Sequence, residues 1–295
     1  MNDMNTREDI EVDLFLEGIF RHYHYDFRNY SRTFIKRRLN LIKTLLQCES
    51  FSILQHKVLH DPLMMIKILN YLTIQVCDMF RDPGYFLSMR HIISSYLSTY
   101  SSIKVWIAGC GTGEELYSLA ILFREEGLEN RTQFFATDIN YEALKRAEAG
   151  VYAMDRLEAF ENNYKLTDPT GSFSKYYTVK NNHAVLDRTL KENTVFYNHS
   201  LVSDSVFGEM HLISCRNVLI YFDSSPQERA IGLFSDALIR KGFLGLGAKE
   251  SLYLSPHASN FTEFQRKDRI YQKMAMHELP PPRVRGIVKV GANER

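Results

Sequence analysis

Three glycines and two glutamates stand together in VWIAGCGTGEELYSLA, between an apolar run and a helical pattern. Gly109, Gly111 and Gly113 follow the apolar run, and glycine lets a backbone loop approach a bound ligand closely. Glu114 and Glu115 then begin the expected helix, where a dinucleotide fold binds pyrophosphate on free N–H groups. Two carboxylates there repel phosphate and favour a phosphate-free ligand with positive charge. S-adenosylmethionine, which combines sulfonium, ammonium and adenosine groups, fits this description.

Other nucleotide ligands fit the loop less well. A glycine loop alone is weak evidence, because several nucleotide-binding folds share it. No Lys followed by Ser or Thr comes after the last glycine, so the loop is not a P-loop. The two glutamates also disfavour a nicotinamide oxidoreductase. A plainer role stays open for them, which is favourable charge at a helix N-terminus, and one of the two could do only that.

Asp138 ends the second apolar run, FFATD. A carboxylate at the tip of the second strand can accept hydrogen bonds from both ribose hydroxyls of an adenosine. The alternative is that Asp138 caps the helix expected from Tyr141. Because the glycine loop stands upstream, we favour ribose binding.

Strands and helices alternate around these residues. Each expected strand is a short apolar run, and each expected helix shows apolar residues at helical spacing. This alternation predicts a parallel sheet covered by helices on both faces. The strands are expected at 105–109, 134–138, 211–215 and 243–247, and the helices at 114–126, 141–149 and 226–240.

The alternation breaks between residues 153 and 198, and the chain before residue 98 is predicted to be helical. The break contains three short segments that are typical of antiparallel strands in a small insertion. Helices are expected over 13–23, after Ser31, and as two stretches within 58–79 that separate near Leu72. Asp82-Pro83-Gly84 predicts a turn. The three short segments are 174–179, 184–187 and 194–198.

Composition limits the possible function classes. The 295 residues contain 36 Lys and Arg against 35 Asp and Glu, so no overall charge attracts nucleic acid or acidic membranes. No apolar run is long enough to span a membrane, and the polar N-terminus excludes a secretory signal. Four scattered cysteines and ten histidines form no metal-ligand spacing, and cysteines in this pattern indicate a reducing compartment. We therefore expect a cytoplasmic protein without bound metal.

Six motifs in the same order resemble those of the CheR family, the chemotaxis-receptor glutamate methyltransferases. The resemblance runs from about Ile19 to Met274. CRNVLIYF (215–222) is the most specific motif. The others are YSRTFIKRRL (30–39), MFRDP (79–83), GCGTGEELYS (109–118), FATDIN (135–140) and FLGLGAKESL (243–252).

The resemblance implies an α/β fold. It consists of a Rossmann-like S-adenosylmethionine methyltransferase domain with a small antiparallel β insertion, preceded by an all-α N-terminal domain. On this basis we divide the chain into a substrate-docking helical domain (1–80), a linker (81–100), a methyltransferase domain (101–275) and a flexible tail (276–295). The inserted β-subdomain is expected at about 155–198.

The resemblance also implies the residues of the site. Arg81 would contact the cofactor from the linker, Glu114 or Glu115 would hold its methionine end, and Asp138 its ribose. Tyr221 and Arg216 are expected to be catalytic. The residues expected to bind the cofactor are Gln75, Cys77, Arg81, Gly109, Glu114, Glu115, Asp138, Ser200, Leu201, Arg216 and Asn217.

Plainer roles remain for several of these residues. Arg216 could form a structural salt bridge, Asn217 could cap a turn, and Tyr221 could belong to the core. His199 lies near the expected pocket, and we favour a hydrogen-bonded histidine at a strand end.

Several cofactor-linked positions depart from the family pattern. The family usually has Thr where Cys77 stands and often Asn where Gln75 stands, and Ser200 replaces an amide before Leu201. Each lost hydrogen bond costs about 0.5–1.5 kcal/mol, so cofactor affinity is expected to be weaker. These departures motivate an alternative function. The chain would then be a catalytically weakened or inactive member that binds cofactor, product or receptor as a regulatory module.

The activity implied by the resemblance is methylation of glutamate side chains on the cytoplasmic helices of a chemoreceptor. S-adenosylmethionine is the methyl donor, and the products are a methyl ester and S-adenosylhomocysteine. A carboxylate is already an anion at neutral pH, so no strong general base is needed. The reaction would serve chemosensory adaptation. A methyltransferase for a small molecule is a further alternative.

The expected docking surface is basic. The stretch from Phe27 to Cys48 contains six basic residues and no acid before Cys48. We expect Lys36, Arg37, Arg38 and Lys43 to dock an acidic receptor helix, with no nucleic acid as partner. An ordinary solvated helix face is the alternative.

Overall fold

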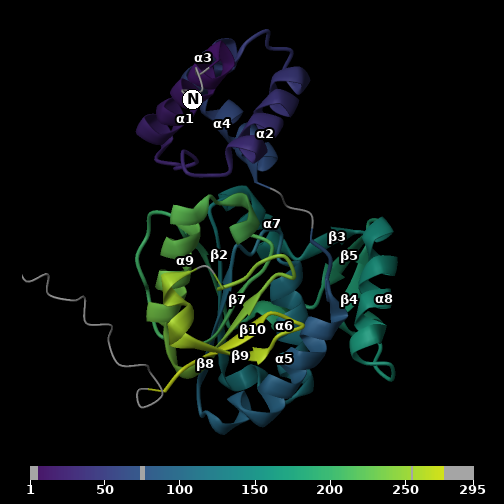
Figure 1. The fold of residues 1–295 in the computed structure, drawn as a ribbon. Coiled ribbons are helices and arrows are strands. Elements are labelled where there is room, and N and C mark those ends of the chain that lie inside the picture. Colours follow the sequence, from purple (N-terminus) through teal and green to yellow (C-terminus); the bar gives the residue numbers. More distant parts are fainter. Residues whose placement is uncertain (1–5, 74–76, 254, 276–295) are drawn as a thin grey trace, which may run out of the picture.

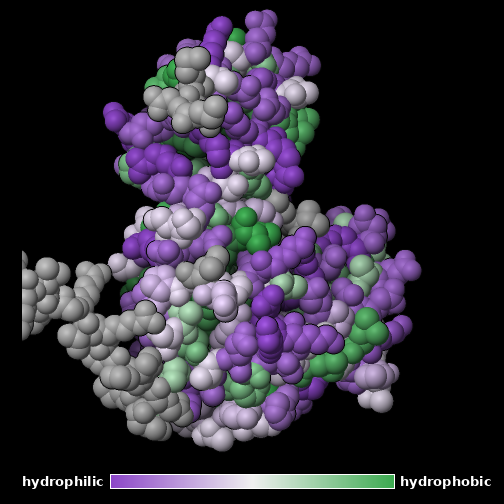
Figure 2. Space-filling model, in the orientation of Figure 1, coloured by the Kyte–Doolittle hydropathy of each residue, from purple (hydrophilic) through white to green (hydrophobic). Residues whose placement is uncertain are grey.

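Four helices form a bundle that stands on a larger α/β body (Figure 1). The computed structural model describes residues 6–73, 77–253 and 255–275. Figure 2 shows that the molecule narrows between the bundle and the body. The four helices are α1 (Arg7–Tyr23), α2 (Arg32–Leu45), α3 (Phe51–His60) and α4 (Pro62–Leu72).

Local capping sets where the bundle helices begin. Helix α3 begins after Ser50, whose hydroxyl accepts the Ile53 N–H at 3.2 Å. Helix α4 begins after Asp61, whose carboxylate accepts the Leu63 N–H at 2.9 Å. Pro62 has no N–H and cannot continue a preceding helix, but it suits the first helical position. Helix α4 does end at Leu72, as expected, but the two expected stretches are wrong, because Asp61 separates α3 from α4 and the described residues 77–82 form no helix.

Apolar side chains from all four helices form the core of the bundle, and Phe15, Leu39 and Val58 are fully buried in it. Ile139 and Tyr221, which belong to the α/β body, pack against the same cluster. The bundle and the body are thus joined by apolar contact as well as by the chain.

Helix α5 (Pro83–Ser95) occupies most of the segment that was expected to be a linker. Pro83 stands at its first position, so the motif that predicted a turn instead starts a helix. Phe86 and Met89 are buried in the same cluster as strand and helix residues of the body. The Tyr85 hydroxyl lies 2.5 Å from that of Ser214. Helix α5 therefore packs as part of the body, and the division into domains stays a prediction.

A seven-stranded mixed sheet forms the centre of the body, in the order β6-β2-β1-β7-β8-β10-β9. The first five strands in this order pair in parallel. Strand β10 then pairs antiparallel with both of its neighbours, β8 and β9. This arrangement confirms the expected fold class. The strands are β1 (Ile103–Ala108), β2 (Thr132–Asp138), β6 (Thr194–Asn198), β7 (Met210–Cys215), β8 (Leu238–Leu246), β9 (Phe261–Gln265) and β10 (Ile270–Lys273).

Side chains of β1 alternate between two apolar clusters. Val105 and Ile107 belong to one cluster, and Trp106 belongs to the other. Successive residues of a strand face opposite sides of the sheet, so both faces are covered, as expected. The covering helices are α5, α6 (Glu114–Glu125), α7 (Tyr141–Ala149) and α9 (Ser224–Ala237), whereas α8 (Leu157–Thr167) lies at the edge of the body (Figure 1).

A small antiparallel sheet lies beside the main one, in the order β3-β5-β4. Its strands are β3 (Val151–Ala153), β4 (Tyr177–Lys180) and β5 (His183–Leu186). The third segment expected here, 194–198, is instead β6, which pairs in parallel with β2. The local sequence does not reveal this parallel pairing, because β6 pairs with the edge of the distant strand β2 rather than with a strand joined to it by a short turn. Among the described helices, none has the length and apolar character that a bilayer span needs.

Replacing Gly245 tests the packing of α5 on the sheet. A Cβ atom on Gly245 of β8 would overlap the Tyr85 hydroxyl. We expect Gly245→Ala to lower the free energy of unfolding by about 1–3 kcal/mol, measured by urea denaturation. Gly208→Ala is the control, because a Cβ there would meet only the Met210 methyl at 3.5 Å. Equal effects of the two substitutions would contradict this packing.

Candidate functional site

A cavity lies at the carboxyl ends of the parallel strands, where the bundle meets the body. Open α/β sheets place their ligands at this edge. The bundle contributes Tyr30, Phe34 and Leu72 to its wall. The body contributes most of the expected cofactor residues, which are Cys77, Arg81, Gly109, Glu115, Asp138, Ser200, Leu201, Arg216 and Asn217. Gln75 lies outside the described residues.

The glycine loop lies tightly against its neighbours. Gly109 has a φ of 76°, and a Cβ atom there would overlap the side chain of Val218. Gly111, with a φ of 56°, faces open space, since a Cβ would meet nothing within 4 Å. The loop therefore keeps room for a ligand beside Gly111.

Asp138 lines the cavity at the end of β2. Its carboxylate accepts the backbone N–H groups of Gly111 and Asn140, both at 2.8 Å. Burial raises the pKa of the Asp138 carboxyl, and these hydrogen bonds oppose the rise. Asn140, rather than Asp138, caps α7, because its side chain accepts the N–H groups of Glu142 and Ala143. The capping alternative for Asp138 is therefore excluded.

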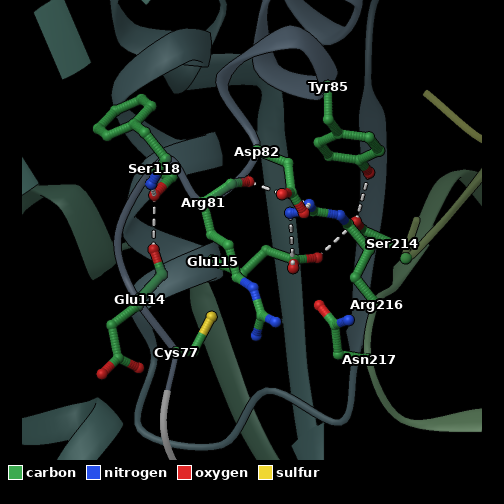
Figure 3. Close-up of polar contacts among 12 residues, drawn as sticks. Cys77, Arg81, Asp82, Tyr85, Glu114, Glu115, Ser118, Ser214, Arg216 and Asn217 are labelled. Carbon is green, nitrogen blue, oxygen red and sulfur yellow. Dashed lines mark hydrogen bonds and ion pairs between the residues drawn. The ribbon is translucent and has the colours of Figure 1, made fainter. Parts of the chain in front are cut away.

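The two glutamates of the glycine motif point apart (Figure 3). Glu115 lines the cavity and accepts the Ser214 hydroxyl at 2.5 Å. Glu114 is fully buried outside the cavity lining, where its carboxylate lies 2.6 Å from the Arg156 guanidinium. Burial raises the pKa of both carboxyls, and the charge of Arg216 opposes the rise at Glu115. The structure thus brings only Glu115 of the expected pair into the cavity.

Arg216 lines the cavity and also forms the salt bridges that the plainer interpretation allowed. Its Nη2 lies 2.7 Å from Asp82 Oδ2 and donates to the Arg81 carbonyl at 3.0 Å. Its Nη1 lies 3.4 Å from Glu115 Oε2. The guanidinium stacks on the Tyr85 ring, 4.1 Å from the ring centre. Arg216 therefore ties the start of α6 to the segment before α5.

Arg81 extends into the cavity from a strained segment (Figure 3). Its neighbours Phe80 and Asp82 have φ values of 53° and 60°, a conformation that costs about 1–2 kcal/mol per residue. The Phe80 N–H is held by the Ser118 hydroxyl at 2.9 Å. Within the described residues, the Arg81 guanidinium makes no hydrogen bond or ion pair. It is a cation that the fold leaves available to a ligand.

Cys77 lines the cavity beside these residues. Burial raises the pKa of its thiol to about 12, and Glu115 and Glu114 add to the rise. The thiol is therefore neutral at physiological pH and is a weak hydrogen-bond donor.

Glu250 holds the loop that follows β7, and sequence reasoning missed it. The Glu250 carboxylate is buried and accepts N–H groups from Asn217 (2.9 Å), Val218 (2.8 Å), Ile220 (3.3 Å) and Gly247 (2.6 Å). Asn217 itself has a φ of 60°, so this loop needs such support. Its place in FLGLGAKESL was the available signal, but three of these four partners, Asn217, Val218 and Ile220, are 30–33 residues away in the sequence.

Tyr221 stands at the base of the bundle and lines the cavity. Its carbonyl accepts the Ser31 N–H at 2.9 Å, and its ring lies 4.7 Å from the ring of Phe34. Burial raises the pKa of the Tyr221 phenol, and the positive charges of Arg38, Arg81 and Arg37 act against this rise. Tyr221 is thus close to three arginines.

The basic residues of α2 have different surroundings. Lys36 forms an ion pair with Asp9 of α1, so it is not available in the way that the pattern of α2 predicted. Arg37 is exposed and has no ion-pair partner among the described residues. Arg38 is partly buried 5.6 Å from the Phe34 ring centre, and its Nε has no hydrogen-bond partner. Lys43 lies over the ring of Phe51.

His199 is buried at the end of β6, with its Nε2 3.2 Å from the Ser205 carbonyl. The expected hydrogen-bonded histidine is confirmed, and it also forms part of the cavity wall. The described residues contain no group of three or more His, Cys, Asp or Glu side chains that could bind a metal ion.

Comparisons with known proteins agree with the motifs. Residues 10–73 match "CheR methyltransferase, all-alpha domain", and residues 75–269 match "CheR methyltransferase, SAM binding domain". "Putative methyltransferase Cher3" of Pseudomonas putida is 49% identical over 92% of this chain and 99% of its own length. A "Chemotaxis protein methyltransferase" of Listeria innocua is 28% identical over 83% of this chain and 92% of its own. An "Uncharacterized 104.1 kDa protein in hypE 3'region" of Rhodobacter capsulatus is 28% identical over 86% of this chain, which spans only 27% of that protein.

Glu250→Gln tests whether the carboxylate holds the loop of Asn217 and Tyr221. A glutamine has nearly the same shape but turns an NH2 group towards backbone donors, which leaves buried N–H groups unpaired. We expect the free energy of unfolding to fall by about 1–3 kcal/mol and S-adenosylhomocysteine to bind less tightly in calorimetry. The control is Glu263→Gln on β9, whose side chain is 51% exposed. Unchanged stability and affinity in Glu250→Gln would refute this role.

Proposed function

Because the chain belongs to the CheR methyltransferase family, we propose that it methylates glutamate side chains on the cytoplasmic helices of a chemoreceptor. Its SAM-binding domain makes it a member of the S-adenosylmethionine-dependent methyltransferases. The observation that carries the glutamate proposal is the charge distribution of the cavity. Carboxylates lie at the strand ends, Arg81 shares the cavity wall with Tyr221, and the charges of Arg38 and Arg37 act on the Tyr221 phenol.

The residues at the strand ends suit S-adenosylmethionine. Glu115 would pair with the ammonium of its methionine part, and Asp138 would accept hydrogen bonds from its ribose hydroxyls. The open space beside Gly111 supports a ligand at this position. Of the two arginines in the cavity wall, Arg216 is already paired with Asp82 and Glu115. A phosphate would therefore meet the carboxylates of Glu115 and Asp138, with Arg81 as the one unpaired cation of the described cavity wall.

The residues near Tyr221 suit an acceptor carboxylate. Once bound, S-adenosylmethionine supplies an electrophilic methyl group. The Arg81 guanidinium has no partner among the described residues. The resemblance implied that it contacts the cofactor, and we propose that it also holds the glutamate carboxylate in line with the methyl group. The Tyr221 phenol, whose pKa burial raises, stays protonated at neutral pH and would donate a hydrogen bond to the same acceptor. Orientation and exclusion of water, rather than a general base, would lower the barrier.

The basic residues of α2 would orient the receptor helix. Arg37 and Arg38 lie near Tyr221, so an acidic helix that meets them is brought towards the cavity. Lys43 lies one to two turns further along α2 and would extend this surface. Lys36 would contribute least, because Asp9 already neutralises it.

One observation favours a second candidate, a member that binds cofactor or receptor without efficient turnover. Cys77 presents a neutral thiol to the cavity where the family usually has a hydroxyl, and a thiol is the weaker donor. This candidate shares the cofactor site with the first and differs only in turnover.

Labelled S-adenosylmethionine and receptor cytoplasmic fragments test the proposed activity. We expect base-labile methyl groups on the receptor, and we expect Arg81→Ala to remove this labelling while retaining measurable binding of S-adenosylhomocysteine. Arg21→Ala is a matched control, because Arg21 lies on the exposed surface of α1 and, among the described residues, forms its ion pair with Glu17. Micromolar product binding without receptor labelling would favour the regulatory module, and labelling that survives Arg81→Ala would refute the role of Arg81.

The raised carboxyl pKa values predict how cofactor affinity depends on pH. Asp138 and Glu115 have pKa values above their ordinary 3.8 and 4.5, so they take up protons at higher pH than exposed carboxyls do. Because the ionised forms bind the cofactor, we expect affinity for S-adenosylhomocysteine to fall as the pH drops from 8 to 5. Calorimetry at several pH values measures this, and Asp138→Asn should flatten the dependence. An affinity that rises towards acid pH would contradict the assignment.

A further inference from the structure

Arg156 lies outside the cavity but touches two segments that form it. It ends the short helix η3 (Met154–Arg156), which directly follows β3 of the small sheet. Its Nη1 lies 2.6 Å from Glu114 Oε1. Its Nη2 lies 3.1 Å from Asp78 Oδ1 and also donates to the Cys77 carbonyl. One guanidinium thus bridges the start of α6 and the start of the segment that carries Arg81.

The bridge from Arg156 holds the Glu114 carboxylate outside the cavity lining. Glu114 has no exposed surface, and it also accepts the Thr112 hydroxyl at 2.7–2.8 Å. Glu115, the next residue, faces the cavity. Without the cation, Glu114 would be a buried carboxylate without an ionic partner, which a fold tolerates poorly. Helix geometry already turns consecutive residues to different sides, and Arg156 provides the counter-charge that stabilises Glu114 in its buried position.

The bridge to Cys77 and Asp78 supports a segment that cannot support itself. Phe80 and Asp82 are in the left-handed conformation, so contacts from elsewhere must hold this backbone. The Met79 carbonyl accepts the side-chain amide of Asn163 in α8 at 3.0 Å. Arg156 and Asn163 both belong to the stretch next to the small sheet, and they hold consecutive residues of the segment.

We propose that Arg156 is a positioning residue of the cofactor site, which clamps the Cys77–Asp82 segment onto the start of α6. The small sheet and α8 then support the segment that forms part of the cofactor cavity. This proposal deepens the proposed function and rests on its cofactor site, but not on the identity of the methyl acceptor. Arg156 touches neither cofactor nor acceptor, so it acts through Glu114, Cys77 and Asp78.

Substitution of Arg156 should weaken cofactor binding and loosen the segment. We expect Arg156→Ala to bind S-adenosylhomocysteine about tenfold less tightly in calorimetry, the loss of roughly one buried charged hydrogen bond. We also expect faster alkylation of the Cys77 thiol, followed peptide by peptide in mass spectrometry, with Cys215 unchanged as an internal reference. Saturating S-adenosylhomocysteine should slow the alkylation of Cys77 again.

Arg124→Ala is the matched control. Arg124 also ties α6 to the rest of the body through Asp187 and Thr189, but at the far end of that helix. We expect it to lower stability without changing product affinity or Cys77 alkylation. Arg156→Lys keeps a charge near Glu114 but cannot bridge both segments, so it should fold like the native chain and still bind less tightly.

Three results would overturn the proposal. They are native affinity in both Arg156 variants, equal loss of affinity in Arg124→Ala, and unchanged Cys77 alkylation in Arg156→Lys. If Arg156→Ala does not fold, Arg156→Lys alone decides. Product binding and Cys77 alkylation are measured without a receptor. The role of Arg156 can therefore be tested even if the chain does not methylate a receptor. Conversely, absence of product binding in the native chain would refute the proposed function itself.

Discussion

The buried contact between Glu115 and Arg216 is the interaction on which the rest of the site depends. It joins the first turn of α6 to the loop after β7, and through Asp82 it reaches the segment before α5. These three segments are far apart in the sequence, and each contributes to the cavity wall. Removing one partner of a buried ion pair costs about 3–5 kcal/mol, because the remaining charge is left unpaired. Because burying both charges also costs desolvation energy, the pair adds little net stability. Its main effect is to fix the positions of the segments that form the cavity.

Around this pair, charge is arranged in two zones. Glu115 and Asp138 provide carboxylates at the strand ends, while Arg81 and Arg38 lie towards Tyr221. The helical bundle closes the cavity from above with Tyr30 and its neighbours, and the stretch next to the small sheet supports it from the side.

Local patterns predicted the elements well and the long-range pairings poorly. Helix α7 begins and ends where its sequence indicated, because Asn140 and Gly150 cap it locally. The glycine loop and Asp138 were also found, since each directly follows an apolar strand. Which of Glu114 and Glu115 faces the cavity could not be foreseen, because the partner that holds Glu114 elsewhere is 42 residues away. The pairing of Lys36 with Asp9 and the parallel pairing of β6 depend in the same way on distant segments.

Our central proposal is that the turn after β1 and the strand ends around it bind an adenosine derivative that carries an ammonium group and no phosphate. Calorimetry with the intact chain tests this directly, by comparing S-adenosylhomocysteine with ADP under identical conditions. The carboxylates of Glu115 and Asp138 predict micromolar binding of S-adenosylhomocysteine and no measurable binding of ADP. ADP that binds as tightly as S-adenosylhomocysteine, or displaces it, would contradict the account.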